Sequence, residues 1–195
     1  PVLPPDVNES FGDFTIVKDN EVKIRFGLRS IKNFGEGVGD AIIAERERSG
    51  KFTSLADFLT RVQNKNLNRR SLESLIRCGA LDNFDERAVM LNAIERLLTF
   101  NKEVGTLGGA QESLFGVLPS SANALELEVV APATPTERLA WEKELLGLYV
   151  SGHPLDKHRE RMAKAGTDIK KVKAELKEGM MTVLAGIVEE VRPIL

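Results

Sequence analysis

The sequence has little of what disulfide-bonded, zinc-binding and membrane-spanning proteins require. Its 195 residues include one cysteine, Cys78, and two histidines, His153 and His158. A single cysteine excludes an internal disulfide and fits a reducing compartment, and so few Cys and His residues argue against a zinc site. No apolar run approaches the length of a membrane span, and residues 1–5 lack the features of a signal peptide. We therefore expect a cytoplasmic protein with no membrane partner.

Net charge is also low, at −2, but the charges are unevenly distributed. Residues 18–78 contain 13 Lys and Arg against 8 Asp and Glu, whereas residues 79–195 contain 14 against 18. A basic half is what contact with phosphate groups requires. The imbalance is modest, so it agrees with nucleic-acid binding without establishing it.

A glycine-rich segment within the basic half predicts a short helix, a turn and the start of a second helix over residues 31–43. Gly35, Gly37 and Gly39 permit positive φ and let another backbone approach closely. The N–H groups at the start of the second helix lack intrahelical partners and favour phosphate. This spacing is typical of the helix-hairpin-helix element, which holds the DNA backbone without reading bases. Glu36 fits this interpretation least well, because a carboxylate must point away from a phosphate.

The same glycines fit two nucleotide-binding motifs less well. A dinucleotide-binding fingerprint follows a strand and spaces its glycines as GxGxxG, whereas the last gap here is one residue too short. No lysine followed by Ser or Thr supports a P-loop. A glycine-rich turn between helices that binds no ligand remains open.

Residues 68–81 resemble a second, degenerate copy of the element, with a turn through Gly79 and Ala80 but without paired glycines. Two copies commonly pack as one unit that holds the phosphates of both strands. Arginines of this copy can position such a backbone, although each taken singly fits a solvated helix face equally well. The candidate DNA-binding residues are Lys32, Asn33, Gly35, Gly37, Val38, Gly39, Arg69, Arg70 and Arg77.

The rest of the chain predicts a mainly α protein with a short β-hairpin over residues 13–26. Ser54 and Asn68 have the spacing of helix N-caps, and an apolar stripe over residues 85–102 indicates a helix packed on the core. We treat Cys78 as a core residue and His153 as a structural one. The expected divisions are residues 1–26, 27–102, 103–135, 136–178 and 179–195.

Residues 103–137 contain no Lys or Arg and are rich in Gly, Ser, Ala and Pro, which predicts a flexible linker. Within it, a glutamine is followed by an aliphatic–aromatic pair. The pentapeptide at residues 111–115 resembles the motif with which bacterial proteins bind the sliding clamp. Alternatively, its apolar pair folds back onto its own domain. The candidate clamp-binding residues are Gln111, Ser113, Leu114 and Phe115.

The final third predicts a helix over residues 136–149, with Trp141, Leu145, Leu148 and Tyr149 on one side. A break at residues 151–155 follows. Residues 181–191 have the composition of a strand and are interpreted as the start of a β-barrel.

Three segments together are similar to the C-family replicative DNA polymerases of bacteria: residues 4–10, 27–33 and 141–155. The resemblance covers essentially the whole chain and implies an internal segment, from the end of the fingers through a tandem helix-hairpin-helix region to the start of an OB-fold. It implies double-stranded DNA, the sliding clamp (the β subunit) and other polymerase III holoenzyme subunits as partners, at replication forks on the nucleoid.

The same resemblance implies that this segment is not itself the enzyme. The family's catalytic aspartates lie upstream of Pro1, so no catalytic residue is expected here. Likewise we expect no metal or cofactor in this segment, while the parent polymerase would use Mg²⁺. Two other functions remain open: a protein-interaction module, and the helix-hairpin-helix part of a DNA repair enzyme or ligase.

Overall fold

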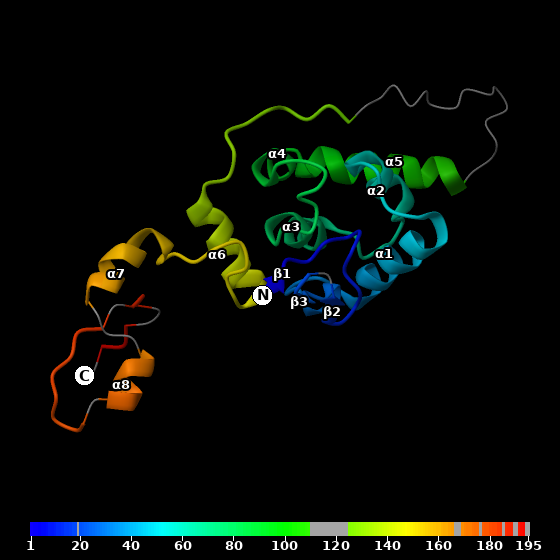
Figure 1. Ribbon diagram of the computed structural model, residues 1–195. Coiled ribbons are helices and arrows are strands. Elements are labelled where there is room, and N and C mark those ends of the chain that lie inside the picture. The colour runs from blue at the N-terminus through cyan, green and yellow to red at the C-terminus, as the bar shows by residue number, and fades with distance from the viewer. Residues whose placement is uncertain are drawn as a thin grey trace. The chain divides into compact units, whose positions relative to one another are not determined.

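The computed structural model describes the chain in seven stretches, and Figure 1 shows their course: residues 1–18, 20–109, 125–165, 169–175, 177–184, 186–188 and 191–193. The chain divides into two compact units, Pro1–Ser151 and Gly152–Leu195. In the described stretches, no helix is both long enough and apolar enough to cross a membrane.

A three-stranded sheet forms the N-terminal part of the first unit. Its strands β1 (Val2–Leu3), β2 (Thr15–Lys18) and β3 (Val22–Arg25) lie in the order β1-β3-β2. The antiparallel pair of β2 and β3 confirms the predicted hairpin, whereas the two-residue β1, which pairs in parallel with β3, gave no sequence signal.

Helices make up most of the remaining described chain, as predicted. They are η1 (Leu28–Ser30), α1 (Glu36–Ser49), α2 (Leu55–Arg61), α3 (Arg69–Arg77), α4 (Arg87–Asn92), α5 (Ile94–Gly109), α6 (Pro135–Leu146), η2 (Asp156–His158), α7 (Arg159–Ala165) and α8 (Ile169–Glu175). The two η elements are single turns of 3₁₀ helix.

The ends of these helices follow local sequence chemistry. The Ser54 side chain accepts a hydrogen bond from the Asp57 N–H at the start of α2, and Asn68 forms a reciprocal capping box with Ser71 at the start of α3. Both predicted N-caps are therefore confirmed. These side chains satisfy N–H groups that the first helical turn leaves unpaired.

The core of the first unit lies between α1, α2, α3 and α5 and beside the turn that precedes α1. It is built from fully buried aliphatic and aromatic side chains, including Leu28, Val38, Ile42, Phe58, Leu59, Leu72, Leu75 and Leu97. The predicted apolar stripe contributes to this core through Val89, Met90, Ile94 and Leu97, although the chain breaks at Ala93 into α4 and α5.

The expected linker begins later than its composition suggests. Helix α5 continues to Gly109, and at Gly105 it lies close to the Gln63 side chain, whose amide oxygen would be 2.3 Å from an added Cβ. Beyond residues 110–124, Leu125 and Leu127 pack against the core. The absence of Lys and Arg over residues 103–137 therefore did not indicate an absence of structure at residues 103–109, 125 and 127.

Helix α6 is shorter than predicted and buries a different side chain. Gly147 adopts a left-handed conformation, with φ of 78°, and ends the helix after Leu146. Leu148 is consequently exposed, whereas Glu142 is 1% exposed. The prediction that Leu148 and Tyr149 share a helix side with Trp141 and Leu145 is therefore wrong, because the helix ends at Leu146.

The described residues of the predicted C-terminal strand form no strand. Met181 and Val188 are 99% and 76% exposed. A strand requires a hydrogen-bonded neighbour, and the described part of residues 177–193 supplies none. The barrel itself therefore remains a prediction.

Candidate nucleic-acid interface

The first hairpin turn lies between η1 and α1, but its left-handed residue is not a glycine. Asn33 has φ of 62°, whereas Gly35, the N-cap of α1, has φ of −70° and ψ of 140°. Asn is the residue besides Gly that most readily adopts this conformation. The expectation that the glycines supply positive φ is therefore wrong, and their role has to be one of space.

The three glycines differ in what surrounds them. A Cβ on Gly39 would lie 3.4 Å from the Phe34 ring, so this glycine serves close packing inside the fold. At Gly37 it would lie 3.4 Å from the Asn66 side chain, and at Gly35 it would meet nothing within 4 Å. Neither backbone conformation nor packing requires glycine at position 35. Its missing side chain leaves open space beside the N-terminus of α1, where an external ligand could approach.

The backbone N–H groups near the turn also fall into two sets: some bond within the fold, and others stay exposed. The Val38 N–H donates to the Gly35 carbonyl at 3.0 Å and its side chain is buried, so Val38 acts as a core residue rather than a phosphate donor. The Lys32 N–H donates to the Leu145 carbonyl of α6 at 3.0 Å. Lys32 can therefore reach a phosphate only through its exposed side chain, while the first turn of α1 at Gly35 and Gly37 stays exposed.

A second segment, residues 64–70, lies against this turn. The Asn64 side-chain amide donates to the Gly37 carbonyl at 3.1 Å, and Arg70 donates to the Asn33 side chain. Lys65, exposed at the tip of this loop, was missed by sequence reasoning because it belongs to neither hairpin copy. We call the exposed set formed by these two segments the hairpin face: Lys32, Asn33, Gly35, Gly37, Lys65, Arg69 and Arg70.

Each basic side chain of the hairpin face is exposed. Arg69 pairs with Glu95, and both side chains are more than half exposed. An ion pair of this kind contributes at most about 1 kcal/mol, so a phosphate can replace the carboxylate at little cost. The hairpin face thus combines backbone donors at a helix N-terminus with four cationic side chains.

The turn predicted for a second hairpin copy is buried. Cys78, Gly79 and Ala80 are inaccessible, and the Ala80 carbonyl accepts a hydrogen bond from the Val7 N–H at 3.1 Å. Gly79 has φ of 84°, and a Cβ there would lie 2.3 Å from the Arg87 guanidinium. Burial also raises the pKa of the Cys78 thiol to about 12, which leaves it an inert core residue, as predicted.

Arg77, the last residue of α3, is engaged within the fold. Its guanidinium pairs with Glu73 at 2.6 Å and lies 5.7 Å from the centre of the Trp141 ring on α6. The structure therefore does not place Arg77 among the exposed side chains of the hairpin face.

A buried ionic network joins α6 to α4 and to the turn between α3 and α4. Arg87 is 3% exposed; it bonds Asp82 at 2.7 and 2.8 Å and lies 3.4 Å from Glu142. Burial acts to lower the pKa of Arg87, but the bonds to Asp82 hold it above the ordinary value. The second carboxylate oxygen of Glu142 accepts the N–H groups of Val150 and Ser151, each at 2.9 Å. This network was not predicted.

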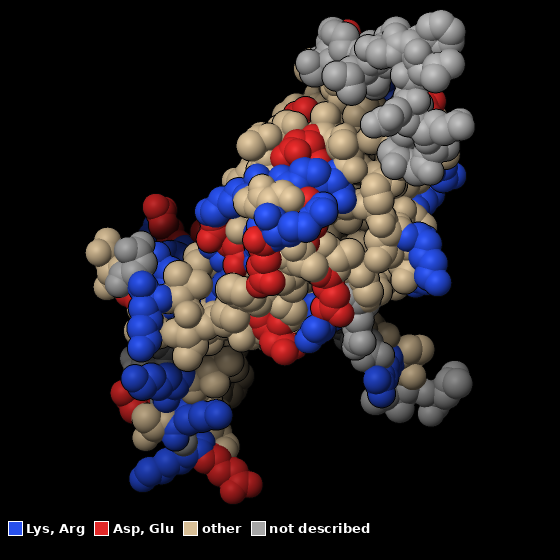
Figure 2. Space-filling view, turned by 90° about the vertical axis from the view of Figure 1, so that its right-hand side faces the viewer, with Lys and Arg blue, Asp and Glu red and all other residues tan. Residues whose placement is uncertain are grey.

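Outside the hairpin face, charges of both signs lie on the described surface of the first unit. Figure 2 shows basic and acidic side chains interspersed across the middle of the molecule on the face in view. The described stretches contain no group of three His, Cys, Asp or Glu residues that could hold a metal ion. The candidate clamp-binding residues Gln111, Ser113, Leu114 and Phe115 lie outside the described residues.

Comparison with known proteins agrees with the first hairpin. Residues 1–90 match a family model described as "Helix-hairpin-helix motif". The chain is 41% identical to DNA polymerase III subunit alpha of Thermus aquaticus over 98% of its own length and 15% of that protein. It is 36% identical to the same subunit of Neisseria meningitidis serogroup B over 99% of the chain and 16% of the relative.

A more distant relative shows the same relation. DNA polymerase III subunit alpha of Escherichia coli O6:H1 is 32% identical over 98% of the chain and 17% of the relative. The chain thus spans about a sixth of the length of these curated relatives. The resemblance inferred from the sequence is confirmed: the chain is homologous over nearly its whole length to one segment of DNA polymerase III alpha subunits.

Proposed function

We propose that this homologue of a polymerase III alpha segment holds double-stranded DNA by its sugar–phosphate backbone through the hairpin face. Phosphates would contact the exposed first turn of α1, and the side chains of Lys32, Lys65, Arg69 and Arg70 would surround them. Contacts of this kind go to the sugar–phosphate backbone and carry no sequence information, so binding would not depend on sequence. A replicative polymerase needs this property, because it has to hold every product duplex alike.

The observation that carries the proposal is Gly35. It has backbone angles that any residue adopts, and a Cβ there would have open space, yet the residue is glycine at an exposed helix N-terminus. A phosphate approaching the N–H groups of α1 occupies the space that a side chain would fill. This feature favours an external ligand over a turn that merely joins two helices.

The proposal predicts the size of the salt effect. Four cationic contacts give a slope of log affinity against log salt of about −3.6, because each phosphate contact contributes about −0.9. Raising the salt from about 50 to about 200 mM should therefore weaken duplex binding by roughly 100-fold. Fluorescence anisotropy with a labelled random-sequence duplex measures this directly.

Two variants localise the binding. Gly35→Val should keep the fold and weaken duplex binding at least about tenfold, whereas Lys32→Glu should weaken it and also reduce the salt slope. Gly152→Val and Lys102→Glu are the matched controls, at a glycine and a lysine outside the hairpin face. Affinity that ignores salt, or that survives both hairpin variants, contradicts the assignment. No duplex affinity at low salt favours the protein-interaction alternative.

We further propose that Gln111, Ser113, Leu114 and Phe115 tether the chain to the sliding clamp. The support is compositional: a glutamine and an aliphatic–aromatic pair stand in a segment without cations, which would not adhere to DNA. Linking two weak contacts raises the effective concentration of the second to about the millimolar range, so one contact can release while the other holds. Replacing Gln111, Leu114 and Phe115 by alanine should abolish binding to purified clamp and leave duplex affinity unchanged. Unaltered clamp affinity in this triple variant refutes the tether.

A further inference from the structure

The loop between α2 and α3 is anchored in the core at both of its ends. Val62 and Leu67 are buried, and the Leu67 N–H donates to the Asn64 carbonyl at 2.9 Å. Between these anchors, the side-chain oxygen of Asn64 accepts the Asn66 N–H at 2.9 Å. An asparagine side chain that bonds the backbone two residues further on forms a tight turn. This turn carries Lys65 at the exposed tip of the loop.

The amide nitrogen of the same Asn64 side chain fixes the turn to α1. It donates to the Gly37 carbonyl at 3.1 Å. The Asn66 side-chain amide also lies beside Gly37, at 3.4 Å from the position of an added Cβ. Asn64 therefore uses its oxygen to shape the turn and its nitrogen to join that turn to the first turn of α1.

Packing alone does not hold this loop against α1. A hollow of about 220 Å³ lies between α1 and residues 61–63, whereas protein interiors are normally close-packed. Toward the C-terminus of α1, Arg61 pairs with Glu45 across this gap at 3.0 Å. Toward the N-terminus, Asn64 bonds Gly37. Removing the Asn64 amide should therefore free the tip of the loop from the start of α1.

We propose that Asn64 is a positioning residue of the hairpin face, which holds Lys65 beside the first turn of α1. This inference rests on the proposed duplex contact. A phosphate at the N–H groups of Gly35 and Gly37 then meets an ammonium group that a separate loop already holds in place. Ordering a mobile loop on binding costs affinity, so a loop that is fixed beforehand binds more tightly. Asn64 itself does not have to touch DNA.

The test measures duplex binding by the full chain, by anisotropy, over a range of salt concentrations. Lys65→Met removes one phosphate contact, so affinity should fall severalfold and the slope of log affinity against log salt should become less steep by about 0.9. Asn64→Ala changes no charge, yet it releases Lys65, so the slope should also become less steep, by up to about 0.9. A side chain that only stabilised the fold would leave the slope unchanged.

The double variant tests whether Asn64 acts through Lys65. When Lys65→Met is already present, Asn64→Ala should cause little further loss of duplex affinity, because the contact that it positions is absent. Residues that act through one another show this lack of additivity.

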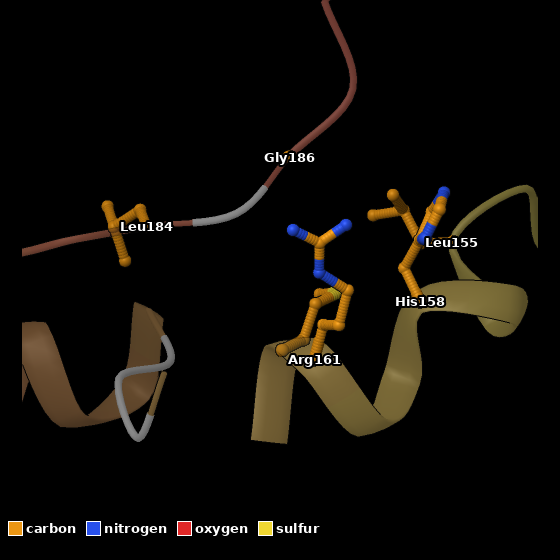
Figure 3. A pocket seen from close by; sticks show the side chains of 6 residues that line it. Leu155, His158, Arg161, Leu184 and Gly186 are labelled. Carbon is orange, nitrogen blue, oxygen red and sulfur yellow. The ribbon is translucent and has the colours of Figure 1, made fainter. Parts of the chain in front are cut away.

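Two controls match these changes. Asn66→Ala alters a neighbouring side chain but keeps the Asn66 N–H that the turn uses, so its salt slope should equal that of the unmodified chain. Arg161→Met removes one cation from the second unit, where the Arg161 guanidinium extends from α7 between Leu155 and Leu184 (Figure 3). Its effect on duplex affinity should add to that of Asn64→Ala.

A measurement without DNA completes the test. In ¹⁵N relaxation of the free chain, the Lys65 amide should become more mobile in Asn64→Ala, and unchanged mobility overturns the proposal. An unchanged salt slope in Asn64→Ala overturns it as well, as does strict additivity of Asn64→Ala and Lys65→Met. If Gly35→Val abolishes duplex binding while Asn64→Ala keeps the slope, only the positioning role fails. A chain without duplex affinity at low salt refutes the proposed function, and this inference with it.

Discussion

Arg87→Met tests whether the buried network holds α6 against α4. Removing the guanidinium leaves Glu142, 1% exposed, without a cation and removes the hydrogen bond to the Arg77 carbonyl. Breaking a buried pair from one side costs about 3–5 kcal/mol. We expect a loss of that size in the free energy of unfolding.

A second substitution separates charge from packing. Glu142→Gln in the Arg87→Met background neutralises the buried carboxylate while keeping an oxygen for the Val150 and Ser151 N–H groups. The double variant should therefore be more stable than Arg87→Met alone, by about 1–3 kcal/mol. Arg69→Met is the matched control: its pair with Glu95 is exposed, and its loss should cost less than about 1 kcal/mol.

The assay is urea unfolding followed by the fluorescence of Trp141, the single tryptophan of the chain. Trp141 precedes Glu142 on α6, so its emission reports on the element that the network holds. If Arg87→Met lowers the free energy of unfolding no more than Arg69→Met does, the network does not hold α6. The same conclusion follows if the double variant is no more stable than Arg87→Met alone.

Three further predictions concern local features. Asn68→Ala removes the capping box of α3 and should cost about 1 kcal/mol in the same urea assay; an unchanged midpoint would show that the cap contributes nothing. Burial acts to raise the pKa of Glu86, but hydrogen bonds from Ala133 and Ala88, and one from Arg138, hold it below the ordinary value. A carboxyl with a lowered pKa in the folded state stabilises the protein above its unfolded pKa of about 4.3, and this stability is lost as the pH falls through the folded pKa. Glu86→Gln should therefore reduce the fall in the free energy of unfolding at acid pH. An identical fall in the variant would contradict this. Cys78, buried with a raised pKa, should react with a thiol reagent at pH 8 only in urea, and rapid reaction of the native chain would disprove its burial.

The sequence predicted those features that depend on near neighbours. The caps at Ser54 and Asn68 and the hairpin of β2 and β3 arise from residues a few positions apart, so their signals are local. The glycines also marked the start of α1, but the short helix expected from residue 31 is the 3₁₀ turn Leu28–Ser30, which lies before the predicted range. For the two caps and the β-hairpin, the physical cause and the sequence pattern coincide.

Features that depend on distant partners were missed. Asn33 takes the left-handed position, and its side chain accepts from Arg70, 37 residues away. Glu142 looks like a solvated helix residue until Arg87, 55 residues away, lies beside it. The burial of the second turn likewise depends on Val7, far upstream. Neither composition nor spacing reports such contacts.

If the hairpin face holds DNA, duplex phosphates contact the start of α1 and not the buried turn at Gly79. Amide NMR of the ¹⁵N-labelled chain, titrated with a random-sequence duplex at low salt, tests it most directly. We expect the Gly35 and Gly37 amide signals to shift progressively with added duplex, while the signal of the buried Gly79 amide stays in place. A shift at Gly79 with Gly35 and Gly37 unmoved would contradict it.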